Sequence, residues 1–340
     1  MQPFEYASAS KKEQVAALLG DQGAILAGGT DLLALIKDDV VAPKRLVNVK
    51  RIDGLRGITY QPGNGLRIGA LTTIAEFAED PNVRQHYPVL AEAAIEAASP
   101  QIRNLATMGG NMCQRPRCWY FRNGMGLFPK APKGKSMVVE GDNRYAAILG
   151  NDDPAYFVSP STLAPVLIAY GAKIRIYSSK ATGTGVRELP LEKFFVIPTA
   201  DGQREHDLKP GEMVIELIVP PPSQNLKAAS YEVRQRAAFD WPLAMASVAL
   251  EMEGNTVKSA RVVLGHVAPI PWISPEAAQA LVGKTITPDT AMAAANAAVA
   301  QAKPLSRNKY KITLTKAAVK RAILNAASGR SGSSTFGGVA

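Results

Sequence analysis

Two pairs of adjacent glycines constrain the fold of this 340-residue chain more than any other feature. Gly28-Gly29 follows a short apolar run, and Gly109-Gly110 comes far later in the sequence. Paired glycines let the backbone turn tightly with its N–H groups pointing outward, which makes a concavity that binds anions. Either pair alone is typical of an ordinary turn. Two such turns that face each other would clamp a diphosphate from both sides.

Short polar side chains accompany both glycine pairs. Thr30 and Asp31 follow the first pair, and Thr107 and Asn111 flank the second. A helix is expected directly after the first pair, over residues 31–37, and its N-terminus would add a partial positive charge. The sequence therefore favours an anion site in which both glycine turns take part.

The familiar phosphate-binding and hydrolase motifs are absent from the sequence. No G-x-G-x-x-G follows an expected strand, and residues 133–136 resemble the end of a P-loop but have Pro129 where the first glycine is needed. Neither H-E-x-x-H nor G-x-S-x-G occurs. The sequence therefore supports neither a zinc hydrolase nor a serine hydrolase.

The chain has only two cysteines and three histidines. Cys113 and Cys118 supply half of the four thiolates that an iron–sulfur cluster normally needs, so two free thiols are favoured. No apolar run approaches the roughly 18 residues of a membrane-spanning helix. The first residues lack the basic and apolar pattern of a secretory signal. We expect a cytoplasmic protein with no metal site and no membrane span.

The formal net charge of +10 is concentrated in two stretches. Residues 103–135 and 303–330 contain basic residues but no acidic ones. Such stretches attract an acidic partner, an anionic ligand or nucleic acid, although a solvated basic face is an equally ordinary explanation. Aromatic residues are sparse among them outside residues 119–121, which argues against nucleic acid as a partner.

The chain divides into four stretches by its pattern of apolar runs and turn residues. Residues 1–55 alternate strand and helix, and residues 56–222 form a second unit that contains a long basic loop over 112–158. Pro220-Pro221-Pro222 is the best linker candidate, so 223–328 is expected to be a C-terminal α+β domain and 329–340 a flexible tail. Expected strands cover 24–27, 46–49, 66–70, 172–177, 213–219, 246–252 and 259–267, and expected helices cover 31–37, 88–98, 291–302 and 314–325. Thr73, with Glu76 three residues later, is expected to cap a further short helix, and Ser274 and Thr287, each followed by proline, are expected to cap two more.

Six segments together resemble the FAD-binding medium subunit of the molybdenum hydroxylases, the xanthine dehydrogenase and carbon monoxide dehydrogenase family. The segments are 27–31, 68–73, 102–111, 160–165, 236–242 and 304–311, and they span nearly the whole chain in the family's order. Residues 114–122 and 143–150 are similar to the aldehyde oxidoreductase branch. In that branch the long loop can carry an extra [4Fe–4S] cluster.

The resemblance implies an α+β fold. A two-part FAD-binding domain of the vanillyl-alcohol-oxidase (PCMH) type would be followed by a C-terminal domain of the CO dehydrogenase flavoprotein type, with a small antiparallel sheet and helices. It also implies FAD as the cofactor. The backbone of the first turn would wrap the diphosphate, the second turn would hold it from the other side, and three further residues would contact the cofactor. These residues are Leu26, Ala27, Gly28, Gly29, Thr30, Asp31, Leu32 and Leu33 in the first turn, Thr107, Gly109, Gly110 and Asn111 in the second, and Ser161, Thr162 and Arg236 beyond them.

Two departures from the family pattern alter these expectations. Ser161-Thr162 stands where the family usually has Ser-Asp, so one carboxylate contact is lost. Only Cys118 fits the cluster pattern of the long loop, so we expect no [4Fe–4S] cluster although the loop is retained. Without its cluster, that loop needs other packing or it will be mobile.

The implied function is electron transfer within a multi-subunit enzyme. A large molybdopterin-binding subunit would oxidise the substrate, and a small subunit would pass electrons singly through [2Fe–2S] clusters to FAD and on to a terminal acceptor. No side chain of this subunit would act as a general acid or base, and the basic stretches, especially 103–135, would dock the partner subunits. Two alternatives stay open: a stand-alone flavoprotein oxidase of the same fold, and a scaffold subunit that has lost its cofactor.

Overall fold

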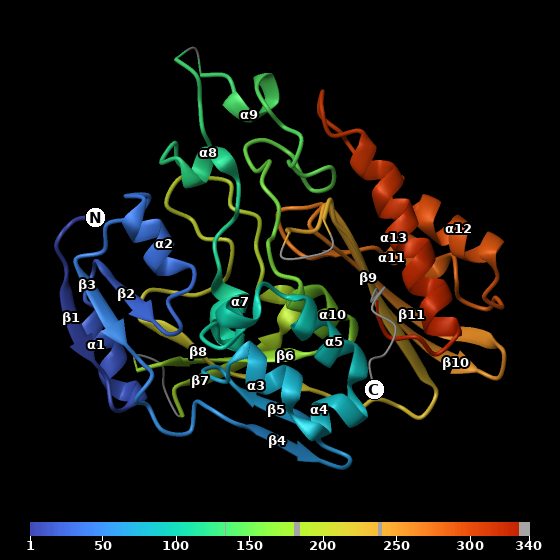
Figure 1. The fold of residues 1–340 in the computed structure, drawn as a ribbon, viewed down its shortest axis with the longest axis horizontal. Coiled ribbons are helices and arrows are strands. Elements are labelled where there is room, and N and C mark those ends of the chain that lie inside the picture. Colours follow the sequence, from blue (N-terminus) through green and yellow to red (C-terminus); the bar gives the residue numbers. More distant parts are fainter. Residues whose placement is uncertain (133, 180–183, 237–239, 333–340) are drawn as a thin grey trace.

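The computed structural model describes residues 1–132, 134–179, 184–236 and 240–332, and these contain three β-sheets (Figure 1). Each sheet is built from one continuous part of the chain, and the three parts follow one another in sequence. Within these ranges, no helix is both long enough and apolar enough to cross a membrane.

The first sheet is parallel and small. Its strands are β1 (Glu5–Ser8), β2 (Gly23–Leu26) and β3 (Arg45–Asn48), in the order β1-β3-β2, and the connections carry η1 (Lys12–Gln14), α1 (Val15–Leu19) and α2 (Leu32–Lys37). The structure confirms the alternation of strand and helix expected for this part of the chain. It adds β1, whose side chains are mostly exposed and therefore gave no apolar pattern.

The second sheet is antiparallel and has five strands. They are β4 (Ile58–Gln61), β5 (Gly65–Gly69), β6 (Lys173–Ser178), β7 (Val186–Pro190) and β8 (Glu212–Val219), in the order β4-β5-β8-β6-β7. Helices from the same part cover it, namely α3 (Ile74–Glu79), α4 (Pro81–His86), α5 (Pro88–Glu96), α6 (Pro100–Arg103), α7 (Met108–Cys113) and α10 (Leu163–Ala169), and η2 (Leu191–Lys193) follows β7. The expected cap at Thr73 is confirmed, because its side chain accepts from Glu76 N and Glu76 bonds back to it.

Residues 112–132 and 134–158 form a long arm with two short helices, α8 (Trp119–Arg122) and α9 (Met137–Glu140), which lie at the top of Figure 1. The side chain of Asn143 ties the base of the arm to the C-terminal part by donating to Ser306 Oγ at 3.0 Å. The ammonium of Lys311, which is buried, adds bonds to the carbonyl oxygens of Ala146 and His266 at 3.2 and 2.7 Å.

The third sheet is antiparallel and carries helices on one face. Its strands are β9 (Leu226–Val233), β10 (Ala244–Glu253), β11 (Thr256–Gly265) and β12 (Trp272–Ile273), and α11 (Pro275–Gln279), α12 (Pro288–Ala298) and α13 (Tyr310–Ala327) follow. Ser274 and Thr287 cap α11 and α12, each with proline in the first turn, as expected. α13 packs on β9 and β10 and is longer than its apolar pattern indicated.

The second and third units share one apolar core. Leu66, Phe77 and Leu167 of the second unit join Met245 and Val263 of the third in a single buried cluster. α10 lies between them and contacts α5, β10 and β11. The end of the described chain also packs here, since Ser230 N of β9 donates to Ser331 O at 2.9 Å. Most of the expected flexible tail, residues 333–340, lies outside the described residues.

Candidate functional site

The two glycine turns lie against each other in the folded chain. Gly28 approaches the backbone before the second turn so closely that a Cβ atom added to it would lie 1.9 Å from the carbonyl oxygen of Leu105. Gly109 is packed less tightly, but a Cβ atom there would still lie only 2.8 Å from Cβ of Ala70. Glycine is therefore required at both positions for steric reasons. The structure confirms the prediction that the two turns meet.

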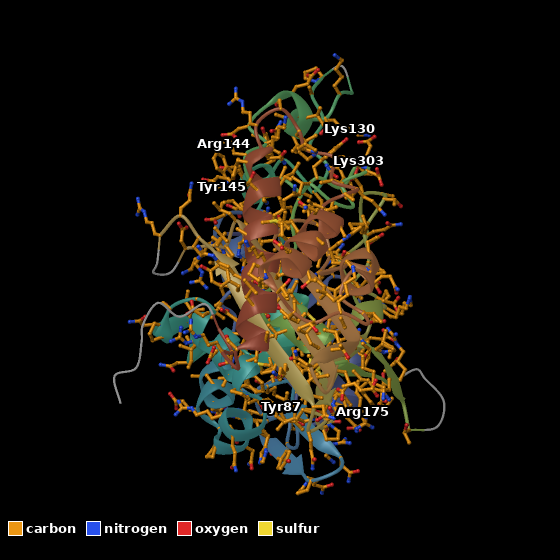
Figure 2. All side chains as sticks on the ribbon, turned by 90° about the vertical axis from the view of Figure 1, so that its right-hand side faces the viewer. Tyr87, Lys130, Arg144, Tyr145, Arg175 and Lys303 are labelled. Carbon is orange, nitrogen blue, oxygen red and sulfur yellow. The ribbon has the colours of Figure 1, made fainter. Side chains whose placement is uncertain are left out.

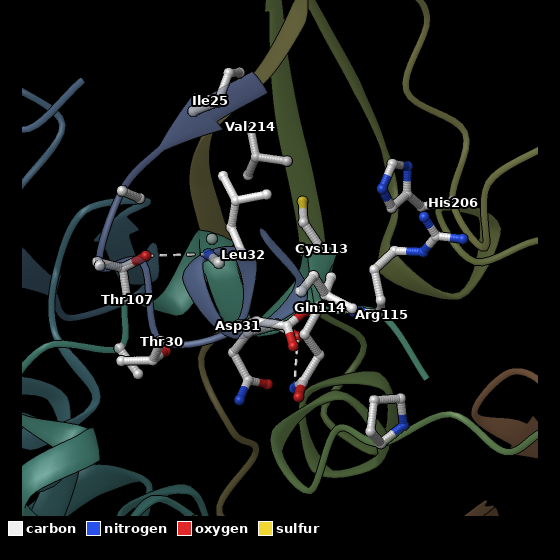
Figure 3. A pocket seen from close by; sticks show the side chains of 18 of the residues that line it. Ile25, Thr30, Asp31, Leu32, Thr107, Cys113, Gln114, Arg115, His206 and Val214 are labelled. Carbon is white, nitrogen blue, oxygen red and sulfur yellow. Dashed lines mark hydrogen bonds between the residues drawn. The ribbon is translucent and has the colours of Figure 1, made fainter. Parts of the chain in front are cut away.

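Between the turns opens a cavity of about 1520 Å³, lined from all three units. Most ligand pockets measure roughly 300–1,000 Å³, so this one has room for an extended dinucleotide. Figure 3 shows Thr30 and Thr107 on one side of it and Arg115 and His206 on the other. Of the residues expected to bind cofactor, it is lined by Ala27, Gly28, Gly29, Thr30, Asp31, Leu32, Thr107, Gly109, Gly110, Asn111 and Thr162.

The first turn presents backbone donors that the protein does not use. Among the described residues, nothing accepts a hydrogen bond from the backbone N–H of Gly28, Gly29, Thr30 or Asp31. Residues 28–31 are partly or fully exposed and line the cavity, so a ligand can reach their N–H groups. A run of free N–H groups at the wall of a cavity is therefore an arrangement that accepts an anion.

The second turn differs, because its backbone donors are already paired. Gly109 N donates to Ala70 O at 2.9 Å, and Gly110 N donates to Oγ1 of Thr107 at 3.1 Å. Asn111 N bonds to the carbonyl oxygen of Thr107 at 2.8 Å. The second turn therefore offers the cavity close packing and the Thr107 and Asn111 side chains rather than a row of free N–H groups.

Asp31 is bound by the arm. Its Oδ1 accepts from Arg117 Nη1 at 2.6 Å and Arg122 Nη2 at 2.7 Å, and its Oδ2 accepts from Arg115 N at 2.8 Å. Burial alone would raise the pKa of Asp31, but the two guanidinium groups outweigh it and hold this pKa below its ordinary value. The carboxylate is thus ionised and links the first glycine turn to the arm.

These pairings correct part of the docking prediction for residues 103–135. Arg117 and Arg122 point inward to Asp31, and Arg115 pairs with Glu205 at 2.9 Å. Buried carboxylates attract these arginines because an ion pair without water around it is weakly screened. These inward-facing arginines are engaged by carboxylates of the same chain. They supply the packing that the arm was expected to need.

Four expected contact residues lie off the main cavity. Leu26 packs in the core behind the first turn, and Leu33 is partly exposed. Ser161 is buried, donates to Asn111 Oδ1 at 2.6 Å, and lines a separate small cavity. Arg236 is exposed, whereas Arg234 lines the main cavity.

Arg234 is held rigidly at the side of the cavity formed by the C-terminal domain. It pairs with the buried carboxylate of Glu232, and its Nη2 lies 3.3 Å from Glu96 Oε2 and 2.8 Å from Glu96 O. Burial raises the pKa of Glu232 although Arg234 opposes that change. Nothing in the sequence distinguished Arg234 from Arg236, because both follow the same strand.

His206 and Cys113 also line the cavity, and neither was predicted to do so. His206 is 7% exposed, and burial together with the charge of Arg204 lowers its pKa to about 3. Burial raises the pKa of Cys113 to about 12, so its thiol keeps its proton. Both cysteines are free thiols, and no group of three His, Cys, Asp or Glu side chains in the described residues is arranged to hold a metal.

Comparison with known proteins places the chain in a family. Residues 2–222 match the family described as the FAD binding domain in molybdopterin dehydrogenase, and residues 229–326 match the CO dehydrogenase flavoprotein C-terminal domain. The chain is 32% identical to the aldehyde oxidoreductase FAD-binding subunit PaoB of Escherichia coli (strain K12), over 86% of this chain and 87% of that protein. It is 30% identical to the carbon monoxide dehydrogenase medium chain of Hydrogenophaga pseudoflava, over 95% of this chain and 96% of that protein.

Solved structures agree with these matches. A chain of carbon monoxide dehydrogenase from Hydrogenophaga pseudoflava that lacks the Mo-pyranopterin moiety of the molybdenum cofactor has a TM-score of 0.74 and 30% identity, covering 97% of this chain and 100% of that chain. A chain of quinoline 2-oxidoreductase from Pseudomonas putida 86 has a TM-score of 0.74 and 26% identity, covering 96% and 98%. The implied fold class and FAD as cofactor are confirmed. The chain therefore belongs to the family of FAD-binding medium subunits of the molybdenum hydroxylases.

Proposed function

We propose that this chain is the FAD-carrying electron-transfer subunit of a molybdenum hydroxylase complex in the cytoplasm. Electrons released by substrate oxidation in a large molybdopterin-binding subunit would arrive through the [2Fe–2S] clusters of a small subunit and leave for a terminal acceptor. The observation that carries the proposal is the row of free N–H groups of the first glycine turn, which faces a cavity of dinucleotide size.

The residues of the cavity fit FAD. The unpaired donors from Gly28 to Asp31 suit a diphosphate, which carries the negative charge that such N–H groups bind. Gly28 allows the two turns to approach without a side chain between them. Apolar side chains, among them Ile25, Leu32 and Val214, line the same cavity and suit the flat faces of the ring systems.

The chain contributes binding and orientation. Bound FAD supplies the redox chemistry, because it accepts electrons and passes them on. Backbone N–H groups of residues 28–31 would hold the diphosphate, with the side chain of Thr107 on the same side of the cavity. Arg234 replaces Arg236 in our assignment of the cation near the cofactor, because Arg234 lines the cavity. We assign no acid–base step to the chain, since the Cys113 thiol keeps its proton and the His206 imidazole is neutral at physiological pH.

The partner subunits would dock at the end of the molecule that carries the arm. Figure 2 shows Lys130, Arg144 and Lys303 at this end, where the side chains of Arg144 and Lys303 are more than half exposed and pair with Asp142 and Asp152. An excess of positive over negative charge steers an acidic surface toward itself, and residues 303–330 have basic side chains but no acidic ones. This face retains the docking role predicted for the basic stretches, without the arginines that turn inward.

The test of the proposal is spectroscopic. The full-length chain, purified and then incubated with FAD and desalted, is expected to keep close to one yellow flavin per chain. A chain that keeps no flavin after reconstitution would contradict the proposal and favour the scaffold alternative. A flavoprotein that oxidises its own substrate alone, and that co-purifies with no molybdenum-containing subunit from its source, would favour the stand-alone oxidase.

A further inference from the structure

His206 is a buried polar side chain that forms no hydrogen bond to another residue in the described part of the chain. Neither Nδ1 nor Nε2 of its ring bonds to any described residue, although the residue is 7% exposed. Leaving a buried polar atom unpaired is unfavourable, and such atoms are rare in native proteins. Since His206 lines the large cavity, a ligand in that cavity is the natural partner.

The ring of His206 is fixed in place before any ligand arrives. It stacks on Phe194, with the ring centroids 5.4 Å apart and the planes 13° from parallel. Its backbone forms an antiparallel bridge with Phe195, and Asp207 N donates to Phe194 O at 2.8 Å. In Figure 3 the imidazole stands beside Arg115 at the edge of the cavity. A side chain held in this way loses little conformational freedom on binding.

The protonation state of His206 suits an uncharged contact. Burial lowers its pKa first, and the positive charges of Arg204 and Arg115 lower it further, to about 3, although an interaction with its own backbone and the charge of Asp207 act in the opposite direction. The neutral imidazole has one N–H donor and one nitrogen acceptor. It can therefore bond to either a donor or an acceptor on a ligand without adding charge to the site.

The other side of His206 faces a small cavity. This cavity of about 10 Å³ is also lined by Glu205 and Ser161, and it has room for about one water molecule. Glu205 Oε2 is likewise buried without a hydrogen bond among the described residues. A water there would serve Glu205 and one ring nitrogen, which leaves the other nitrogen for the large cavity.

We propose that His206 binds the cofactor directly, through one hydrogen bond from its neutral ring to a polar atom of FAD. This inference rests on the proposed function, because it takes FAD as the occupant of the cavity. His206 then positions the cofactor on the wall opposite the first glycine turn. This contact accounts for one of the two unpaired ring nitrogens, and a water in the small cavity accounts for the other.

The experiment compares His206→Phe with His206→Gln in the full-length chain. Phenylalanine keeps the stacking on Phe194 but removes both nitrogens, whereas glutamine keeps a donor and an acceptor. We expect H206F to weaken FAD binding about tenfold, and H206Q to bind within about threefold of wild type. His86→Phe is the matched control, because His86 stacks on Tyr60 in a different part of the fold and should leave FAD affinity unchanged.

A second readout separates cofactor contact from a purely structural role. Without FAD, H206F is expected to be at least as stable as wild type, because the substitution removes an unpaired buried polar group. With FAD, its gain in melting temperature should be smaller than that of wild type. If H206F does not fold, His206→Met takes its place as the apolar variant.

The possible failures are distinguishable. Wild-type chain that binds no FAD would overturn the proposed function together with this inference. Wild type that binds FAD while H206F binds equally tightly, with an unchanged flavin absorption spectrum, would overturn the role of His206 alone. An H206F chain destabilised without FAD as much as with it would also overturn it, since that result indicates a structural residue.

Discussion

Gly28 is the residue at which the two turns approach most closely. A methyl group there would overlap the Leu105 carbonyl, which is backbone and cannot rotate away. The sequence identified both glycine pairs because tight turns have few alternatives to glycine. It did not reveal that close approach, more than backbone conformation, demands glycine at this position.

Gly28→Ala is therefore expected to separate the two turns. We expect the free energy of unfolding to fall by about 2 kcal/mol or more, as for other overpacked sites, and FAD affinity to fall sharply. Urea denaturation and flavin titration measure the two effects. Gly124→Ala is the control, because it adds the same methyl group in open space, at a positive φ of 77° that costs about 1 kcal/mol of strain. Equal FAD affinity in the two variants would refute the steric argument.

The contacts of charged residues are the part of the site that could not be predicted from the sequence. Asp31 was identified beside the first turn, yet its partners Arg117 and Arg122 come from a distant part of the chain. Arg236 was chosen by resemblance, but the end of β9 carries Arg234 into the cavity instead. Pairings of this kind depend on tertiary contacts, which leave no local pattern.

Among the elements, the arm depends most on a few polar contacts. Besides its ion pairs with Asp31, the guanidinium of Arg117 lies 4.8 Å from the ring centroid of Trp241, and that of Arg115 lies 4.7 Å from Phe121. Such contacts stabilise modestly, at about 0.5–2 kcal/mol each. The carboxylate of Asp31 is the point on which two of the arginines converge.

Asp31→Asn should loosen the arm. It leaves Arg117 and Arg122 largely buried without their counter-charge, so we expect a loss of about 2–3 kcal/mol near neutral pH. Because the pKa of Asp31 is lowered in the folded chain, this stabilisation is present above the ordinary value of 3.8 and is lost as the pH falls through the folded value. The difference between wild type and D31N should thus be constant from about pH 7 to pH 5 and shrink below about pH 4.

Chemical denaturation across this pH range, together with limited proteolysis of the arm, tests the expectation. Asp142→Asn is the matched control, because Asp142 pairs with Arg144 at 2.7 Å on the exposed part of the same arm. Exposed ion pairs contribute little to stability. A D31N chain that behaves like D142N would show that the arm is held by other contacts.

The strands and helices that could be predicted are those with a clear apolar face or cap. β8, β10 and β11 were anticipated from their buried runs, and the caps at Thr73 and Thr287 from their residue types. β1 and β4 were missed because their side chains are mostly half-buried or exposed. Short strands of this kind are specified by their neighbours more than by their own sequence.

At the scale of the whole molecule, the cavity joins three units. The first turn belongs to the first unit, α7 and Thr162 to the second, and Arg234, Trp241 and Pro242 follow the first strand of the third. The sequence predicted that the two glycine turns would share a cavity. It could not predict the contribution of the third unit or of His206, because these segments carry no recognisable binding motif.

FAD should therefore stabilise the units together. At a free concentration of 100 times Kd, we expect a gain of about 2.7 kcal/mol in unfolding free energy. Protection against hydrogen exchange should extend from the first glycine turn to residues near Trp241. Riboflavin, which lacks the diphosphate, should stabilise far less, because it cannot use the N–H groups of the first turn. Equal stabilisation by both ligands would argue against the diphosphate site.

The wide spacing of the cavity residues also matters for biosynthesis. The wall of the cavity begins at Leu19 and is completed only at Pro242. While a ribosome is still making the first two sheets, the cavity that would bind FAD is therefore incomplete in the nascent chain. FAD can therefore bind in the complete cavity only after translation has passed the start of the C-terminal domain. A shortage of flavin would accordingly leave nearly completed chains without cofactor.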